Sequence, residues 1–115
     1  MTVTAQSTGT QTTIIGTEHT LVDVAVAGTF TLHVDTNVMA AADVLELRIY
    51  QIVLTGGTRR VAYYDVFTDA QAADNLIKIS VPISNELTDA GSLRFTMKQT
   101  AGTVHAYPWK VLKYA

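Results

Sequence analysis

Apolar and polar residues alternate along most of the chain with a period of two, which is the period of a β-strand that buries one face. The alternation is clearest in residues 29–35, where Phe30, Leu32 and Val34 share one side of the strand. Residues 92–99 repeat the pattern, with Phe95 on the apolar side. Strands are predicted at residues 12–15, 20–26, 29–35, 44–55, 59–68, 76–83, 92–99 and 104–114.

Residues 76–83 follow the same rule, which turns their aliphatic side chains toward the core and their polar side chains toward solvent. The predicted inward residues are Ile77, Ile79, Val81 and Ile83, and the predicted outward residues are Lys78 and Ser80. Pro82 has no N–H to donate to a neighbouring strand, so this strand ends there or lies at a sheet edge.

Short strands at this spacing predict an all-β fold, an antiparallel two-sheet sandwich of about eight strands with jelly-roll or Greek-key connections. Gly56 and Gly57, which stand between two threonines, predict a tight hairpin near the middle of the chain. An immunoglobulin-like sandwich is the alternative. The chain lacks the cysteine and tryptophan frame of that fold, although many such sandwiches lack it too.

The first thirteen residues interrupt the pattern, because they are polar and threonine-rich and contain no basic residue. They do not fit a secretory signal peptide, and no segment has the roughly 18–20 apolar residues that span a bilayer, so we expect synthesis in a cytosol. We predict a polar N-terminal arm at residues 1–13, either flexible or paired as an edge strand, and a single sandwich domain at residues 14–115. Thr10 and Gln11 are the candidate interface residues of the arm, because such arms can add a strand to a neighbour's sheet.

Composition supports the sheet prediction and adds a hint of association. Thr, Val and Ile account for 38 of the 115 residues, and these β-branched side chains suit pleated sheets. Only 16% of residues are charged, against about 25% in an ordinary soluble domain, and weakly charged surfaces tend to associate. The formal net charge of -2, with Arg59 and Arg60 on opposite faces of one strand, argues against nucleic-acid binding.

The sequence holds no recognisable catalytic or metal-binding set. It has no cysteine, and its histidines, His19, His33 and His105, lack a second histidine at ligand spacing. Five aspartates stand at predicted strand ends, where aspartate shapes turns: Asp35, Asp43, Asp69, Asp74 and Asp89. A calcium site of Asp35, Asn37 and Asp43 is the less favoured alternative. We therefore expect no catalytic residues, no metal and no cofactor, and a protein that is not an enzyme.

Aromatic residues are the most informative surface candidates. They occur as Tyr63-Tyr64 and as Tyr107-Pro108-Trp109, where alternation is expected to bury one member of each group and leave another near the surface. Exposed Tyr and Trp side chains often anchor interfaces or stack on sugars. Tyr64, Tyr107 and Trp109 are therefore candidate interface residues, with a core position as the alternative for Trp109 and for one of the paired tyrosines.

Five stretches of the chain carry a resemblance to known proteins: VLELRIY at 44–50, GGTRRVAY at 56–63, KISVPIS at 78–84, FTMKQTAGT at 95–103 and YPWKVLK at 107–113. Together they resemble small structural proteins of tailed bacteriophages, of the head decoration or cement kind. The resemblance implies a β-sandwich on the capsid surface of a virion, often a trimer or other symmetric homo-oligomer. The implied partner is the major capsid protein, and neither nucleic acid nor membrane is expected as a partner.

Three functional hypotheses follow. The first is a non-enzymatic virion structural protein that binds the phage head surface and stabilises it through many weak contacts. The alternative is a glycan-binding or adhesion module of a virion surface or tail fibre, with Tyr64, Tyr107 or Trp109 as a stacking platform. A small β-sandwich enzyme is the third hypothesis, and no residue pattern favours it.

Overall fold

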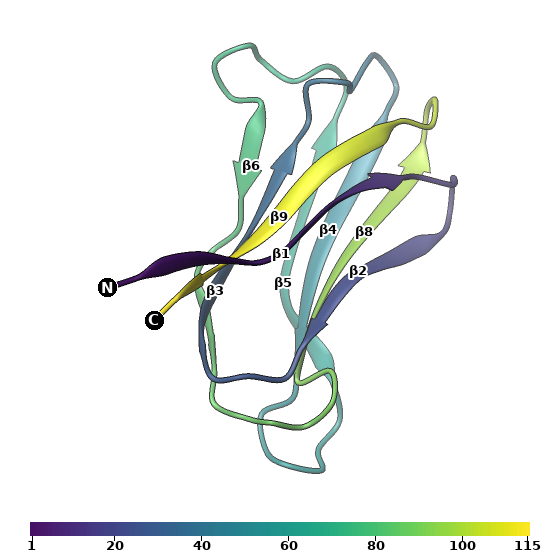
Figure 1. Cartoon of the computed structure of the whole chain (residues 1–115). Coiled ribbons are helices and arrows are strands. Elements are labelled where there is room, and N and C mark those ends of the chain that lie inside the picture. The colour runs from purple at the N-terminus through teal and green to yellow at the C-terminus, as the bar shows by residue number, and fades with distance from the viewer.

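Nine antiparallel strands in two packed sheets, without a helix, form the computed structural model, which describes all residues from 1 to 115 (Figure 1). No helix long and apolar enough to cross a membrane is present. The all-β, two-sheet prediction is confirmed. The strands are β1 (Val3–Thr12), β2 (Glu18–Val24), β3 (Gly28–Asp35), β4 (Val44–Gln51), β5 (Arg60–Thr68), β6 (Ile77–Ile79), β7 (Ile83–Asn85), β8 (Leu93–Ala101) and β9 (Ala106–Tyr114).

The order of strands within the sheets defines a jelly roll. Sheet A has the order β1-β9-β3-β6, and β7 also pairs with β3, while sheet B has the order β2-β8-β4-β5. Because β6 and β7 pair with opposite ends of β3, they act as one strand interrupted near Pro82. The first strand then pairs with the last, the second with the last but one, and so on inward, which is jelly-roll nesting and differs from the immunoglobulin arrangement.

The connection between β4 and β5 is longer than the predicted two-residue hairpin. The strand β4 ends at Gln51 and β5 begins at Arg60, so eight residues connect them. Only Gly56 has a positive φ, of 77°, and the N–H of Gly57 donates to the carbonyl of Leu54 at 2.8 Å. This connection is therefore a loop and not a tight two-residue hairpin.

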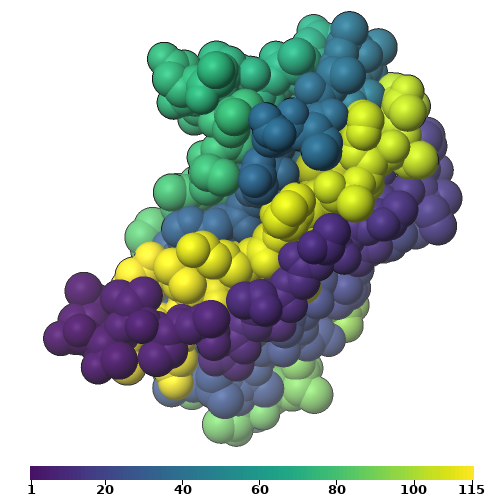
Figure 2. All heavy atoms as spheres, turned by 45° about the horizontal axis from the view of Figure 1, so that its top comes forward, coloured from purple at the N-terminus to yellow at the C-terminus, as the bar shows by residue number.

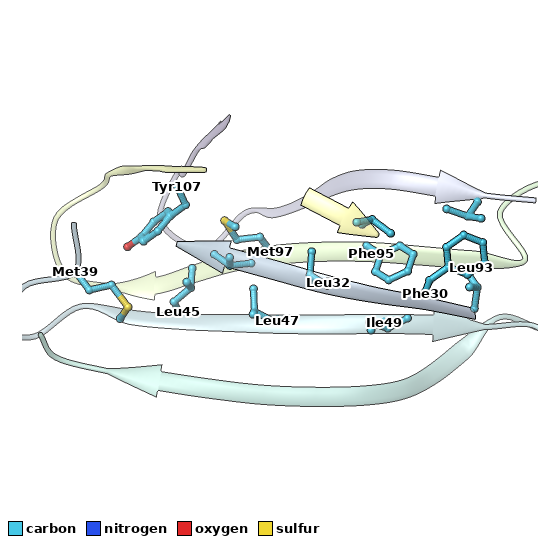
Figure 3. Close-up of a cluster of buried hydrophobic side chains, with 13 residues drawn as sticks. Phe30, Leu32, Met39, Leu45, Leu47, Ile49, Leu93, Phe95, Met97 and Tyr107 are labelled. Carbon is cyan, nitrogen blue, oxygen red and sulfur yellow. The ribbon is translucent and has the colours of Figure 1, made fainter. Parts of the chain in front are cut away.

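The core lies between the two sheets and comes mainly from four strands (Figure 3). The alternation predicted for residues 29–35 and 92–99 is confirmed, because their apolar sides are buried. Three of the four strands contribute three fully or almost fully buried side chains each, from alternate positions, and β9 contributes two. They are Phe30, Leu32 and Val34 of β3, Leu45, Leu47 and Ile49 of β4, and Leu93, Phe95 and Met97 of β8, joined by Tyr107 and Val111 of β9.

In residues 77–81, which comprise β6 and the two residues after it, the buried and exposed faces are the reverse of the prediction. Lys78 and Ser80 are buried, whereas Ile77, Ile79 and Val81 are 50%, 59% and 55% exposed. The Ser80 hydroxyl accepts from the N–H of Leu32 at 2.9 Å, and the Ser80 N–H donates to the Leu32 carbonyl at 2.9 Å.

Lys78 is buried beside an aromatic ring of the other sheet. Its Nζ lies 5.0 Å from the ring centroid of Phe67, where a cation is attracted to the face of the ring and the aliphatic stem packs against apolar surface. The inward prediction for Ile77, Ile79 and Val81 is therefore wrong. At this sheet edge the Ser80–Leu32 hydrogen bonds and the Lys78–Phe67 contact stabilise an orientation opposite to the one that the hydrophobic pattern predicts.

The polar N-terminal segment is the edge strand β1 of sheet A. It pairs with β9 from Val3↔Tyr114 to Thr12↔Ala106, and Figure 2 shows the two segments side by side along the molecule. Of the two alternatives for residues 1–13, a flexible arm or an edge strand, the structure has the edge strand. The domain boundary expected after residue 13 therefore falls inside the sandwich.

Gly9 allows β1 to lie over the chain's single tryptophan, since a Cβ at this position would stand 3.0 Å from Cζ2 of Trp109. We expect Gly9→Val to reduce the free energy of unfolding by about 1–3 kcal/mol through overpacking. The fluorescence maximum of Trp109 should shift to longer wavelength as the ring is displaced. Thr10→Val is the matched control, because its exposed side chain on the other face of β1 should change stability by less than about 0.5 kcal/mol. Equal melts for the two variants would contradict the close packing.

Candidate functional site

The two outer faces of the sandwich differ in chemistry. The outer face of sheet A, called face A, carries few charges and several exposed aliphatic side chains. Its two charged residues are Asp35 of β3 and Lys110 of β9. Exposed aliphatic residues lie at its two edges, with Val3 on β1 and Ile77 and Ile79 on β6. Face A is therefore a weakly charged sheet surface with exposed apolar side chains at both edges.

Hydroxyl groups and a histidine fill the middle of face A. The Thr31 hydroxyl lies 2.9 Å from His33 Nε2 and 3.0 Å from the Tyr114 hydroxyl. Burial, helped by the positive charge of Lys110, places the pKa of His33 below its ordinary value. The imidazole is therefore mostly neutral at pH 7, which keeps this face weakly charged.

A shallow hollow of about 340 Å³ lies on face A beside these groups. It is open to solvent and offers both apolar surface and a few hydrogen-bonding groups. Its lining residues are Thr8, His33, Asp35, Ile77, Pro108, Trp109 and Lys110.

The outer face of sheet B, called face B, is charged and internally paired. Arg48 contacts Glu46 at 2.8 Å, and its guanidinium carbon lies 4.7 Å from the ring centroid of Tyr64. Arg94 makes a two-pronged contact with Asp23, from Nε to Oδ1 at 2.8 Å and from Nη2 to Oδ2 at 2.9 Å. These pairs hold planar polar groups in fixed orientations.

A larger hollow, of about 560 Å³, lies on face B and is called hollow B. Its floor comes from β2, β4 and β8, and one wall comes from the end of the β4–β5 loop. The lining residues are Glu18, Thr20, Tyr50, Thr58, Arg59, Arg94 and Thr96.

Within hollow B, the Tyr50 hydroxyl donates to Glu18 Oε2 at 2.5 Å. Burial opposes the charge of Glu18, but the hydrogen bond from Tyr50, the nearby Thr96 hydroxyl and the nearby positive charges outweigh it, so the pKa of Glu18 lies below the ordinary value. Burial and the same carboxylate raise the pKa of Tyr50. Glu18 is therefore a charged acceptor and Tyr50 a neutral donor at neutral pH.

A buried polar cluster closes one end of the sandwich. The Asp43 carboxylate accepts from the N–H groups of Ala40 and Thr103, each at 2.9 Å, and joins the loop before β4 to the β8–β9 hairpin. His105 Nε2 lies 2.8 Å from Asp43 Oδ2, but off the direction of a regular hydrogen bond. Gly102, with φ of 90°, makes room for Asp43, since a Cβ there would stand 2.1 Å from Oδ1. This cluster is packed as a structural joint between loops.

Tyr107 belongs to the same end of the core and is fully buried (Figure 3). Its hydroxyl has no hydrogen-bond partner, and burial together with the charge of Asp43 raises the pKa of Tyr107 to about 12. The expectation that Tyr107 serves an interface is therefore wrong. Because Tyr107 and Trp109 are two residues apart in β9, they share the inner face, and Pro108 is the outward member of the trio.

The other candidate interface residues do not meet in one site. Thr10 is exposed and Gln11 half-buried on β1, and Trp109 is half-buried beneath the same strand. Tyr64 is half-exposed on face B, in the opposite sheet. No single aromatic platform forms from the predicted set.

The predicted turn role of the aspartates agrees with the structure. Asp35 Oδ1 accepts from the N–H of Asn37, two residues on, and Asp43 Oδ2 accepts from the N–H of Ala40, three residues before it. Asp43 is also held inside the buried polar cluster, where it accepts from the N–H groups of Ala40 and Thr103.

The residues of hollow B were not among the sequence candidates. Glu18, Tyr50, Arg59 and Arg94 lie on separate elements, and they come together only through the pairing of β2 and β4 with β8. The sequence shows these residues only as outward polar positions on several predicted strands. Which of them are neighbours depends on the strand register, which the sequence does not give.

The nested pairing of strands defines this chain as a jelly-roll β-sandwich. In comparisons with protein-family models, with curated proteins and with solved structures, the chain matches none of them. The resemblance to phage head decoration proteins stays a prediction.

Proposed function

We propose that this chain is a non-enzymatic structural protein of a virion, a decoration or cement protein that binds the capsid surface through face A. The observation that carries the proposal is the inverted edge of sheet A, where Ile77, Ile79 and Val81 face solvent while Lys78 is buried. Edge strands of soluble sandwiches usually point charges outward, because exposed apolar edges invite association. An edge arranged in the opposite way suits a protein that is covered by a partner.

The partner in this proposal is the major capsid protein of the same virion. Weak charge and hydroxyl groups across face A allow close contact with a protein surface without a large desolvation cost. A homo-oligomer, with a trimer favoured, would present several copies of face A to the lattice, and linked contacts raise the effective concentration of each. The formal net charge of -2 gives no support to a role in nucleic-acid binding.

A glycan-binding or adhesion module of a virion surface or tail fibre is the second candidate function. Its expected platform of Tyr64, Tyr107 and Trp109 does not assemble, because these side chains are divided between face B, the core and the underside of β1. Sugar binding therefore needs another set of residues.

Charge introduced on face A tests the first proposal. We expect Ile79→Lys to weaken binding to capsids stripped of decoration proteins at least tenfold, measured by co-sedimentation with particles of the phage that encodes the chain. The variant should fold normally, because Ile79 is already more than half exposed and lysine suits an edge strand.

Val66→Lys on face B is the matched control, since Val66 is another exposed aliphatic residue on an edge strand. It should leave capsid binding unchanged. Equal binding by the two variants, or no binding by the unmodified protein, would overturn the proposal.

A further inference from the structure

We propose that hollow B binds a neutral sugar chain, independently of the docking role of face A. Sugars present neighbouring hydroxyl groups that both donate and accept hydrogen bonds, together with an apolar ring face. Hollow B offers a matching surface, with the Glu18 carboxylate as acceptor, guanidinium groups as donors, threonine hydroxyls that do both, and the Tyr50 ring. Its volume of about 560 Å³ falls in the range of small-ligand pockets, roughly 300–1,000 Å³.

An unpartnered hydroxyl points to a ligand at the floor of hollow B. Thr96 lies on β8, in the middle of sheet B, and is only 2% exposed. Its hydroxyl lies near Glu18 but makes no hydrogen bond of regular geometry. A buried hydroxyl without a partner costs free energy, so most buried polar groups are paired. A sugar hydroxyl seated beside Glu18 would supply the missing partner.

The polar side chains around Thr96 are held in place before any ligand arrives. Tyr50 orients Glu18 through their 2.5 Å hydrogen bond, and Asp23 orients Arg94 through the two-pronged contact. Arg59 donates to the carbonyl of Gly91 at 3.3 Å.

Gly91 also leaves room for that guanidinium, because a Cβ at this position would stand 2.5 Å from Arg59 Nη1. Side chains fixed in this way lose little conformational entropy when a ligand binds.

Charge balance selects an uncharged ligand over an anion. The positive charges of Arg59 and Arg94 are matched by Glu18 in the lining and by Asp23 directly behind Arg94. An anion would meet the Glu18 carboxylate as well as the guanidinium groups. A neutral polyhydroxyl ligand uses acceptors and donors alike and leaves both ion contacts intact.

The test is a titration of ¹⁵N-labelled protein with maltohexaose, cellohexaose, mannohexaose and a β-galactan oligosaccharide, followed by amide chemical shifts. At least one of these probes should shift the amides of Thr20, Tyr50 and Thr96 and leave those of face A unchanged. Inorganic phosphate and glucuronate are the anionic probes. Shifts of the same amides by these anions alone, shifts confined to face A, or no shift with any of the neutral probes would overturn the proposal.

Three variants separate binding from folding. Tyr50→Ala should weaken binding at least tenfold, whereas Tyr64→Ala, on the same face but outside hollow B, should not. Thr96→Val removes the hydroxyl and nearly keeps the shape, so it should weaken binding about tenfold while the melting temperature stays equal or rises. If Thr96→Val melts higher and binds the sugar as well as the unmodified protein, the hydroxyl does not serve a ligand and the proposed site is wrong.

Discussion

Replacing Phe30 or Phe95 with alanine is expected to lower the free energy of unfolding by about 3–5 kcal/mol, which is a large part of the roughly 5–15 kcal/mol typical of a whole domain. The two rings come from opposite sheets, Phe30 from β3 and Phe95 from β8, and both are fully buried. Figure 3 shows them close together at one end of the apolar cluster. Truncating either ring leaves a cavity that the tightly paired strands cannot close.

Urea unfolding of each variant measures the loss. Phe67→Ala is the matched control, because Phe67 is the third phenylalanine of the chain and lies half-buried on the edge strand β5. It should lose clearly less stability than either core variant, although it removes the ring beneath Lys78. A loss below about 1 kcal/mol for both Phe30→Ala and Phe95→Ala would show that the assigned core is wrong.

The central strands could be predicted from sequence because their environment is simple. In β3, β4 and β8 every second residue faces the other sheet and is buried, so Phe30, Leu47 and Phe95 follow the expected period. Each of these strands has a neighbouring strand on both sides, which pairs with its backbone N–H and carbonyl groups. Hydrophobic burial alone then decides which way each side chain points.

The edge strands could not be predicted in this way. At β6 the side chain of Ser80 supplies hydrogen bonding to β3, and Lys78 finds an aromatic ring, so polar contacts decide the orientation. At β1 the stabilising interactions are mainly backbone hydrogen bonds to β9, which leave no trace in side-chain hydrophobicity. A threonine-rich sequence is compatible with such a strand and with a flexible arm.

The candidate sites depend on register, which a single sequence does not fix. Hollow B aligns Tyr50 of β4 with Arg94 of β8, and the pairing of β2 with β8 shifts at a bulge between Thr20 and Val22. A shift of one residue would turn these side chains to the other face. The chemistry of each residue was visible in the sequence, but the arrangement that makes a site was not.

The end cluster leads to a second large effect, because Asp43 is a buried carboxylate that joins two loops. We expect Asp43→Ala to cost about 3–5 kcal/mol, since it leaves the N–H groups of Ala40 and Thr103 without their acceptor and removes the partner of His105. Asp23→Asn is the control, because it breaks a partly exposed ion pair with Arg94, worth about 0–1 kcal/mol. Urea unfolding at pH 7 compares the two variants.

The same carboxylate should make stability depend on pH. Burial raises the pKa of Asp43, but the hydrogen bonds from the two N–H groups and the nearby His105 lower it by a larger amount. The folded-state pKa of Asp43 therefore lies below the ordinary value. A lowered folded-state pKa means that the charged carboxylate stabilises the fold above the unfolded-state pKa, about 4, and that this contribution is lost as the pH falls through the folded-state pKa. Asp43→Asn should therefore be less stable than the unmodified protein at pH 7 and should lose less stability between pH 5 and pH 3. Parallel stability curves for the two proteins over that interval would show that Asp43 does not contribute to the acid response.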